Sequence, residues 1–186
     1  MKLVLIRHGQ TQWNSQNRLH GWLDSPLTEH AKAQLLTLTL PSLNDPIVYT
    51  SDLGRALESA NIIANRMAAD MIIDRRLRER RFGILQGKVI NQDKALKKYW
   101  QQYHRRYITP LTHIPDIESE NMFAKRIHSF LGYLATQAID RDIIIVSHGE
   151  WLRGLHNIIH TLPSWHKGNG IPDNLITVTY QFNLLK

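Results

Sequence analysis

Two runs of consecutive aliphatic residues stand out in the hydrophobic pattern of the chain, and each stops abruptly before a His-Gly pair. Residues 2–6, KLVLI, are followed by Arg7, His8 and Gly9, and residues 143–146, IIIV, are followed by the letters SHG. A continuous apolar run, unlike an alternating one, is typical of a strand buried on both faces. Both segments are therefore predicted to be interior strands.

Shorter apolar segments and helical stripes occupy the chain between these two strands. Residues 45–51 predict a third strand and residues 70–77 a weaker fourth. Thr28 is a suitable N-cap for a helix that continues to about Leu38. Two further stripes have the spacing of an amphipathic helix: Leu53, Leu57, Ala60, Ile63, Ala64 and Met67, and then Phe123, Ile127, Phe130, Leu131, Leu134 and Ala138.

Strands that alternate with helices indicate βαβ units and a mostly parallel sheet. The predicted fold is therefore a single α/β domain over residues 1–186, with a doubly wound sheet and helices on both faces. Ligands of such sheets bind at the carboxyl ends of the strands, where loops lead into helix N-termini. If the first and last predicted strands are neighbours, their two His-Gly pairs lie together at that edge.

The composition excludes several classes of protein. The chain has 186 residues, of which 42% are hydrophobic and 21% charged, enough for one buried core. It has no cysteine, so it forms neither a disulfide framework nor a thiolate metal site, and a reducing compartment is the default. The first apolar run is too short for a signal peptide or a membrane span. We therefore expect a cytoplasmic protein that does not bind a membrane, and the oligomeric state stays open.

The net charge of +7 favours anionic partners, which include nucleic acids and small phosphorylated substrates. Residues 94–107 interleave basic and aromatic side chains, as single-stranded nucleic-acid platforms do. Tyr99, Tyr103 and Tyr107 recur every four residues, however, which favours an amphipathic helix packed against the domain. We expect a small phosphorylated metabolite as the partner, and no nucleic acid.

A third strand-to-helix junction adds an arginine to the two histidines. The segment YTSDLGRALESA places Arg55 in the first turn of the helix that follows residues 45–51. Arg7 and Arg55 would then stand with His8 and His148 at one edge of the sheet, and two guanidiniums suit a phosphate dianion. A histidine between them can attack phosphorus in line and carry the phosphoryl group.

Five blocks of the sequence resemble, in the right order, those of the histidine phosphatase superfamily, also called the phosphoglycerate mutase-like family. The blocks are RHGQTQWN, GWLDSPLTE, YTSDLGRALESANIIA, LRERRFGILQG and VSHGEWLRG. The resemblance covers most of the chain and thins between about residues 90 and 115 and after residue 160. It implies a doubly wound sheet with a helical lid region near residues 85–120 that sets specificity.

The resemblance also implies a role for each residue of the predicted cluster. His8 would be the nucleophile that becomes phosphohistidine, and Glu79 the proton donor to the leaving group and then the base that activates water. His20 would either contact phosphate or fill a loop. The family uses no metal, and we expect no other cofactor. Arg7, Arg55 and His148 would form the phosphate pocket, and Asn14 and Gly21 would contribute contacts.

Two reactions share such a site, and they differ in whether water or a second phosphate group accepts the phosphoryl group. The segments ERRFG and HRRYITP resemble the mutase branch, which depends on 2,3-bisphosphoglycerate, and there Arg80, Arg105 and Arg106 would bind the three-carbon acid. Phe82, however, stands where that branch has tyrosine, which removes a hydroxyl group.

Glu150 stands where the mutases carry asparagine. A carboxylate there repels a doubly anionic ligand, unless Arg153 or another cation pairs with it. We therefore predict a metal-independent hydrolase of small phosphate monoesters. The alternatives are a phosphoglycerate mutase and a non-catalytic module that binds phosphate or nucleic acid.

The proposed proton donor has a demanding environment. Glu79 must be protonated when attack begins, although the usual pKa of a glutamate is about 4.3. A phosphate dianion nearby raises the pKa of Glu79, and the guanidiniums of Arg78, Arg80 or Arg81 would lower it if they lay close. We therefore expect Arg80 or Arg81 to point to substrate or solvent.

Overall fold

Five strands form one sheet in the computed structural model of the chain, which describes residues 1–137 and 140–181. The strand order is β3-β2-β4-β1-β5. The first four strands along the chain are parallel, and β5 (Thr177–Gln181) pairs antiparallel with β1 at one edge. The parallel strands are β1 (Lys2–Arg7), β2 (Ile47–Thr50), β3 (Asp70–Ile73) and β4 (Ile143–Ser147). The predicted mostly parallel sheet is therefore confirmed.

The two strands that precede the His-Gly pairs are neighbours. β1 and β4 pair in parallel, with Arg7 opposite Ser147 at their carboxyl ends. Val4 and Ile6 of β1 point into the core against α2 and α3, whereas Leu3 and Leu5 point into the core against α5 and α6. Side chains alternate between the faces of a strand, so a strand covered on both faces is apolar throughout.

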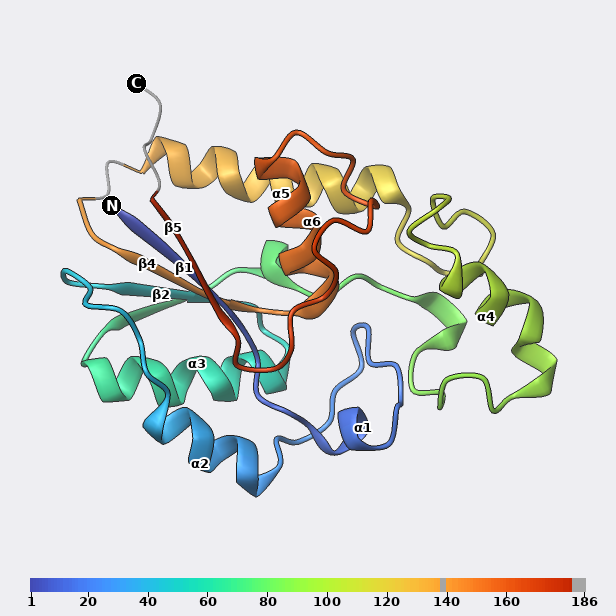
Figure 1. Cartoon of the computed structure of the whole chain (residues 1–186), viewed down its shortest axis with the longest axis horizontal. Coiled ribbons are helices and arrows are strands. Elements are labelled where there is room, and N and C mark those ends of the chain that lie inside the picture. Colours follow the sequence, from blue (N-terminus) through green and yellow to red (C-terminus); the bar gives the residue numbers. More distant parts are fainter. Residues whose placement is uncertain (138–139, 182–186) are drawn as a thin grey trace.

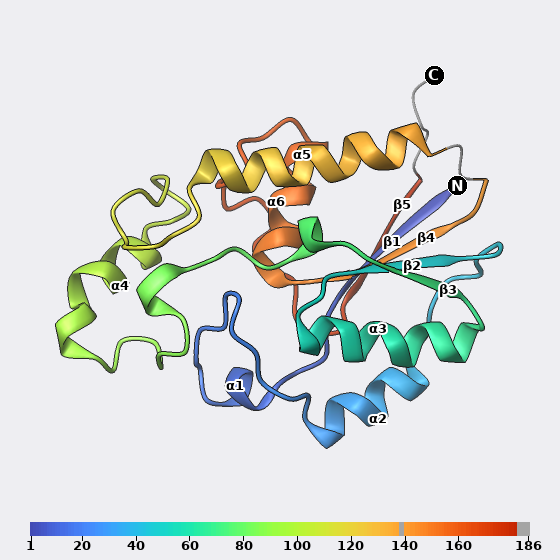
Figure 2. The same cartoon turned by 180° about the vertical axis from the view of Figure 1, so that it is seen from behind.

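Helices cover both faces of the sheet, as Figures 1 and 2 show from opposite sides. α2 (Glu29–Thr37) and α3 (Gly54–Met67) lie on one face, and α5 (Glu120–Thr136) and α6 (Gly149–Ile159) lie on the other. This is the doubly wound α/β fold that the sequence predicts. In the described part of the chain, none of the helices combines the length and the apolar character needed to cross a membrane.

Local capping explains where these elements begin and end. The Thr28 hydroxyl accepts a hydrogen bond from the Ala31 N–H at 3.1 Å, so α2 starts where the sequence predicts. The strand predicted over residues 70–77 is too long, because the Asp74 carboxylate accepts from the Arg76 N–H at 2.8 Å and starts a short 3₁₀ turn. α5 has the predicted stripe, although its expected last member, Ala138, lies outside the described residues.

The segment between β3 and α5 extends beyond the carboxyl ends of the parallel strands (Figure 1). It contains α4 (Lys97–His104), and near it in the same view lies the short α1 (Gln12–Ser15). Trp100 and Tyr103 of α4 are buried, which fits a helix packed by its aromatic face. The segment has a small core of its own, made of Phe82, Leu85, Trp100, Tyr103, Leu111 and Ile114.

Candidate active site

His8 directly follows β1 and is held in the strand ladder. Its backbone N–H donates to the Ser147 carbonyl at 3.0 Å, and its side chain is almost fully buried. Nδ1 lies 2.8 Å from the Gly9 carbonyl. A carbonyl only accepts, so Nδ1 carries the proton and Nε2 holds the free lone pair. Nε2 is therefore the atom of His8 that can attack a substrate.

The buried guanidinium of Arg55 is fixed beside that atom. Its Nε donates to His8 Nε2 at 3.2 Å. Its terminal nitrogens donate to the carbonyls of Leu23 and Gly21, each at 2.9 Å, and one of them pairs with Asp24 at 3.0 Å. These contacts hold the cation before any ligand arrives, so that little reorganisation is needed for it to bind a phosphate oxygen.

His148 and Arg7 complete the surroundings of His8. The His148 ring lies 5.2 Å from the His8 ring between centroids, and its Nε2 lies 2.7 Å from the Ser51 hydroxyl. Arg7 donates through one terminal nitrogen to the Pro172 carbonyl at 2.8 Å. Among the described residues, His148 Nδ1 and Arg7 Nε are buried without a hydrogen-bond partner. Buried polar atoms without partners are costly, so both are suited to meet an anionic ligand.

The two buried histidines are held in the neutral form. Burial lowers the pKa of His8 well below 6.5, and the charges of Arg55 and Arg7 lower it further. The pKa of His148 is also lowered well below 6.5, mainly by burial and then by Arg55. A neutral imidazole keeps its lone pair, so His8 is a competent nucleophile throughout the neutral pH range.

The Glu79 carboxyl group is placed by two backbone donors. Its Oε1 accepts from the Arg80 N–H at 2.9 Å, and its Oε2 accepts from the Glu150 N–H at 3.3 Å. Its own carbonyl accepts from Trp22 Nε1 at 2.7 Å and from the Arg126 guanidinium at 3.2 Å. Burial raises the pKa of Glu79, the charge of Glu150 raises it further, and the backbone donors and Arg55 only partly oppose this.

Seven of the residues predicted for the site line one cavity of about 160 Å³. They are Arg7, His8, Asn14, His20, Gly21, Arg55 and Glu79. His148 stands beside His8 without being part of the cavity wall. Four chain segments that are far apart in sequence therefore meet at the carboxyl ends of β1, β2 and β4, as expected for an open parallel sheet.

Asn14, His20 and Gly21 have roles within the loop as well as in the wall. Asn14 Oδ1 accepts from the Thr11 N–H and hydroxyl, each at 3.0 Å, which leaves the amide nitrogen as the donor for a ligand. His20 Nε2 lies 2.8 Å from the same Thr11 hydroxyl. Gly21 has φ +56°, and a Cβ there would lie 2.1 Å from Gln86 Oε1, so the position favours glycine.

Arg80 does not reach the cavity, contrary to the prediction that it binds substrate. Its guanidinium is buried, pairs with Glu120 at 2.6 Å and donates to the Glu118 carbonyl. Glu118 and Glu120, next to the N-terminus of α5, bind the Arg80 guanidinium because they lie beside the segment that contains Glu79. Arg78 binds Asp52, and the exposed Arg81 has the orientation toward solvent that we expected of one of the two arginines.

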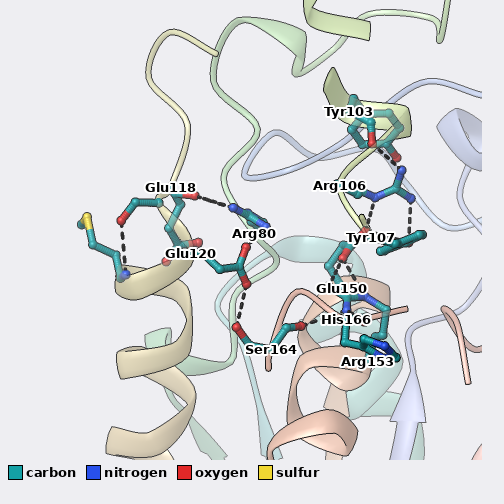
Figure 3. A network of polar contacts seen from close by, with 12 residues as sticks. Arg80, Tyr103, Arg106, Tyr107, Glu118, Glu120, Glu150, Arg153, Ser164 and His166 are labelled. Carbon is teal, nitrogen blue, oxygen red and sulfur yellow. Dashed lines mark hydrogen bonds and ion pairs between the residues drawn. The ribbon is translucent and has the colours of Figure 1, made fainter. Parts of the chain in front are cut away.

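The tandem arginines that follow α4 do not line the cavity either. Arg105 is exposed. Arg106 donates through Nε to Glu150 Oε1 at 2.7 Å, and Arg153 binds Glu150 Oε2 from the other side (Figure 3). Burial alone would raise the pKa of Glu150, but Arg153 and Arg106 lower it to about 2. The repulsion expected from Glu150 is thus offset by two cations.

Several residues of the site were not expected from the sequence. Asp24, Ser51 and Tyr103 contact or face the predicted cluster, and the first two lie in the blocks GWLDSPLTE and YTSD. Their positions in those blocks were the available signal. Within residues 1–137 and 140–181, no group of three or more histidine, aspartate or glutamate side chains is arranged to hold a metal ion.

Known proteins resemble the chain along almost its whole length. The "Probable phosphoglycerate mutase GpmB" of Cronobacter sakazakii is 34% identical over 169 residues, which are 89% of this chain and 77% of that protein. The crystal structure of the alpha-ribazole phosphatase from Shigella flexneri is 26% identical, with a TM-score of 0.82 over 98% of this chain and 91% of that one.

A mycobacterial glucosyl-3-phosphoglycerate phosphatase is 27% identical, with a TM-score of 0.77 over 96% of this chain and 88% of that one. The order of the sequence blocks, the doubly wound sheet and the histidine–arginine cluster at its edge agree with these similarities. The family model of the histidine phosphatase superfamily (branch 1) matches residues 3–181, and the chain belongs to that superfamily.

Proposed function

We propose that the protein hydrolyses small phosphate monoesters through a phosphohistidine intermediate on His8. The observation that carries this proposal is the neutral, buried His8, whose Nε2 lone pair faces the Arg55 guanidinium at 3.2 Å. The Glu79 carboxyl group lines the same cavity, and its pKa is raised. A nucleophile, a phosphate-binding cation and an acid thus share one small space.

In the first step, His8 Nε2 attacks phosphorus and the bond between phosphorus and the ester oxygen breaks. The leaving alkoxide takes the proton of Glu79 and departs as an alcohol. Arg7 and Arg55, with His148, stabilise the charge on the three remaining phosphate oxygens. The products of the step are the alcohol, phosphohistidine and an ionised Glu79.

In the second step, the Glu79 carboxylate takes a proton from water, and the oxygen of that water attacks phosphorus. The bond between phosphorus and Nε2 breaks, the lone pair returns to His8, and inorganic phosphate leaves. Glu79 ends the cycle protonated and is ready for the next substrate. A raised pKa suits both duties, because the group must give up a proton and recover it near neutral pH.

Phosphoglycerate mutase activity is the second candidate, since the curated relative described above is named a mutase. Two of the three arginines that would bind a three-carbon acid are engaged elsewhere, however. Arg80 pairs with Glu120 and Arg106 with Glu150. The two solved structures described above carry the names of phosphatases. These observations support hydrolysis over mutase activity. The ion pairs of Glu150, in turn, offset the repulsion of a doubly anionic ligand that the sequence alone led us to expect.

A panel of phosphorylated metabolites, assayed for phosphate release in the presence of EDTA, tests the proposal. We expect release from at least one monoester by the unaltered protein and by His128→Ala, which removes an exposed histidine of α5, and none by His8→Ala. Interconversion of phosphoglycerates that requires 2,3-bisphosphoglycerate, without phosphate release from any monoester, would instead establish the mutase.

A further inference from the structure

Glu150 is the centre of a buried ion-pair cluster on the wall of the cavity. Its Oε1 accepts from Arg106 Nε at 2.7 Å and from the Tyr107 hydroxyl at 3.1 Å. Its Oε2 accepts twice from Arg153, at 2.7 and 3.0 Å. Figure 3 shows the carboxylate between the two guanidiniums. Four donors saturate the acceptor capacity of the carboxylate, so no further ligand competes for it.

The same cluster determines where the Arg106 cation lies. Besides Glu150, the guanidinium donates to the Tyr103 carbonyl at 2.9 Å and to the Tyr107 hydroxyl at 2.7 Å. It also stacks on both tyrosine rings, 3.9 and 4.2 Å from their centroids. Arg106 contributes nothing to the cavity wall, and its side chain is only 11% exposed. Glu150 therefore withholds from the cavity the lid arginine that follows the exposed Arg105.

The wall beyond the phosphate-binding residues includes five uncharged side chains, those of Leu19, Phe82, Ile90, Tyr103 and Ile171. Asn17 and the paired carboxylate of Glu150 also line the cavity. Burial raises the pKa of Tyr103 to about 12, so its hydroxyl stays neutral at physiological pH.

Arg7 and Arg55 stand at the phosphate end of the cavity. Arg18 also lines it, but its guanidinium is held on the loop by the Gly87 carbonyl at 2.6 Å and by the Trp13 ring. The leaving-group end therefore lacks the paired cations that a carboxylate or a second phosphate would need.

We propose that Glu150 is a specificity-determining residue, which binds Arg106 away from the cavity and so restricts the enzyme to monoesters with an uncharged leaving group. This inference rests on the proposed hydrolysis at the same site and names its class of substrate. It explains why a carboxylate is useful at position 150, beside an anion-binding site, where it would otherwise only weaken phosphate binding. The negative charge of Glu150 instead neutralises the neighbouring Arg106.

Two matched substrates test the inference. Glycerol 3-phosphate carries a hydroxymethyl group at the position where 3-phosphoglycerate carries a carboxylate, and the two are otherwise alike. We expect kcat/KM of the unaltered enzyme to favour glycerol 3-phosphate by about tenfold, the value of one charge-assisted hydrogen bond. Glu150→Gln keeps the volume of the side chain and releases Arg106 from its counter-charge. This variant should shift the ratio of the two kcat/KM values toward phosphoglycerate by about tenfold.

Three further variants separate selectivity from a loss of structure. In Glu150→Gln with Arg106→Gln, the released cation is absent and the shift should disappear. Arg106→Gln alone uncovers the Glu150 charge, so that discrimination against phosphoglycerate should increase. Asp142→Asn removes a buried carboxylate at the opposite end of β4 and should leave the ratio unchanged. Each ratio comes from one preparation, so the folded fraction cancels.

Binding to His8→Ala and to His8→Ala with Glu150→Gln, measured by titration calorimetry, gives the same comparison without turnover. A shift of relative affinity toward phosphoglycerate in the second protein supports the inference even if the proposed hydrolysis fails. A preference of the unaltered enzyme for phosphoglycerate over glycerol 3-phosphate would overturn the inference. Ratios within twofold of each other in the unaltered, Glu150→Gln and Arg106→Gln proteins would overturn it as well.

Discussion

The two ends of the cavity are built in different ways. At the phosphate end, the positions follow from strand register: Arg7 lies opposite Ser147, and the histidines that come next stand 5.2 Å apart between ring centroids. At the leaving-group end, α4 and the loops around it are held to the body by side-chain contacts such as the Arg106–Glu150 pair. On the proposed function, the reacting groups are therefore positioned by the sheet, whereas selectivity depends on a few side-chain contacts.

The contacts that hold the charged groups also differ between the ends. Arg55 is held by the backbone carbonyls of Leu23 and Gly21 as well as by the Asp24 carboxylate, so its position depends on the loop that contains all three residues. Arg106 is held by the Glu150 carboxylate and by two tyrosines, and we expect a single substitution to release it. Substitutions at the first end should therefore lower the rate strongly for every substrate, whereas those at the second should change the preference among substrates.

The largest effect short of removing the nucleophile is expected for Glu79→Gln. The amide keeps the shape of the side chain and cannot donate a carboxyl proton to the leaving group. For an alkyl phosphate we expect kcat to fall by about 10³-fold, within the usual range of general acid–base catalysis. For p-nitrophenyl phosphate, whose leaving group needs no proton, the fall of the burst rate should be far smaller. Equal losses for both substrates would contradict the assignment of Glu79 as the acid.

Arg55→Ala compares the two ends of the cavity directly. Loss of this preorganised cation should lower kcat by about 10²-fold, as expected when one charge-stabilising donor is removed from an active site. Arg55→Lys should recover little, because an ammonium cannot reproduce the planar fork that contacts His8, Leu23 and Gly21 together.

Arg106→Gln is the matched control for Arg55→Ala and should change kcat for glycerol 3-phosphate by only a few-fold. Steady-state assays of the three variants provide the comparison. Similar losses of kcat in Arg55→Ala and Arg106→Gln would contradict the assignment of catalysis to one end of the cavity and of selectivity to the other.

The pH dependence of kcat/KM should report the pKa of Glu79, which depends on charged groups at both ends of the cavity. In the proposed mechanism the active form of Glu79 is protonated, and burial raises its pKa, so kcat/KM should fall as pH increases above that pKa. The groups around it are Arg7 of β1, Arg55 of α3, Tyr103 of α4, Arg126 of α5 and Glu150 of α6.

Of these groups, Glu150 raises the pKa of Glu79 by its negative charge. Glu150→Gln should therefore move the alkaline limb of kcat/KM to lower pH, by about one unit. The ionisation of the substrate is common to both proteins and cancels in this comparison. A limb that stays in place, or moves to higher pH, would show that Glu79 does not feel the charge of Glu150.

The smallest effect is expected outside both ends. Gly132 lies on the exposed side of α5, and a Cβ there would meet no atom within 4 Å. Gly132→Ala should stabilise the protein by about 0.5–1 kcal/mol, because alanine loses less conformational entropy in a helix. Thermal unfolding should show a higher Tm, with kcat unchanged for every substrate. A change in kcat would mean that α5 influences the site more than its contacts indicate.

The sequence predicted the phosphate end well because its determinants are local. A continuous apolar run marks an interior strand, and whatever follows directly must appear at the sheet edge, as His8 and His148 do. β5 was not predicted, since the segment TVTYQ pairs through one side only and leaves all of its side chains partly or fully exposed. Its pattern is that of an edge strand, with too few buried positions to stand out.

The partners of buried arginines could not be predicted from the sequence. Arg80 could have faced substrate, but it meets Glu120, forty positions away in the chain. Arg106 meets Glu150 at a similar separation. Which carboxylate pairs with which arginine depends on how the segment between β3 and α5 packs, and no periodicity in the sequence predicts that packing. For Glu150 the sequence indicated Arg153 as a possible partner, and this pair is present, whereas the pairing with Arg106 was not predicted.

The central claim is that the phosphoryl group passes through His8 on its way to water. Rapid mixing with a radiolabelled phosphate monoester, followed by an alkaline quench and peptide mapping, tests it directly. The account predicts an acid-labile label on the peptide that carries His8, formed and lost at rates compatible with turnover. The label should be absent in His8→Ala and retained in His128→Ala. Turnover without any labelled protein, or a label on another residue, would contradict the account.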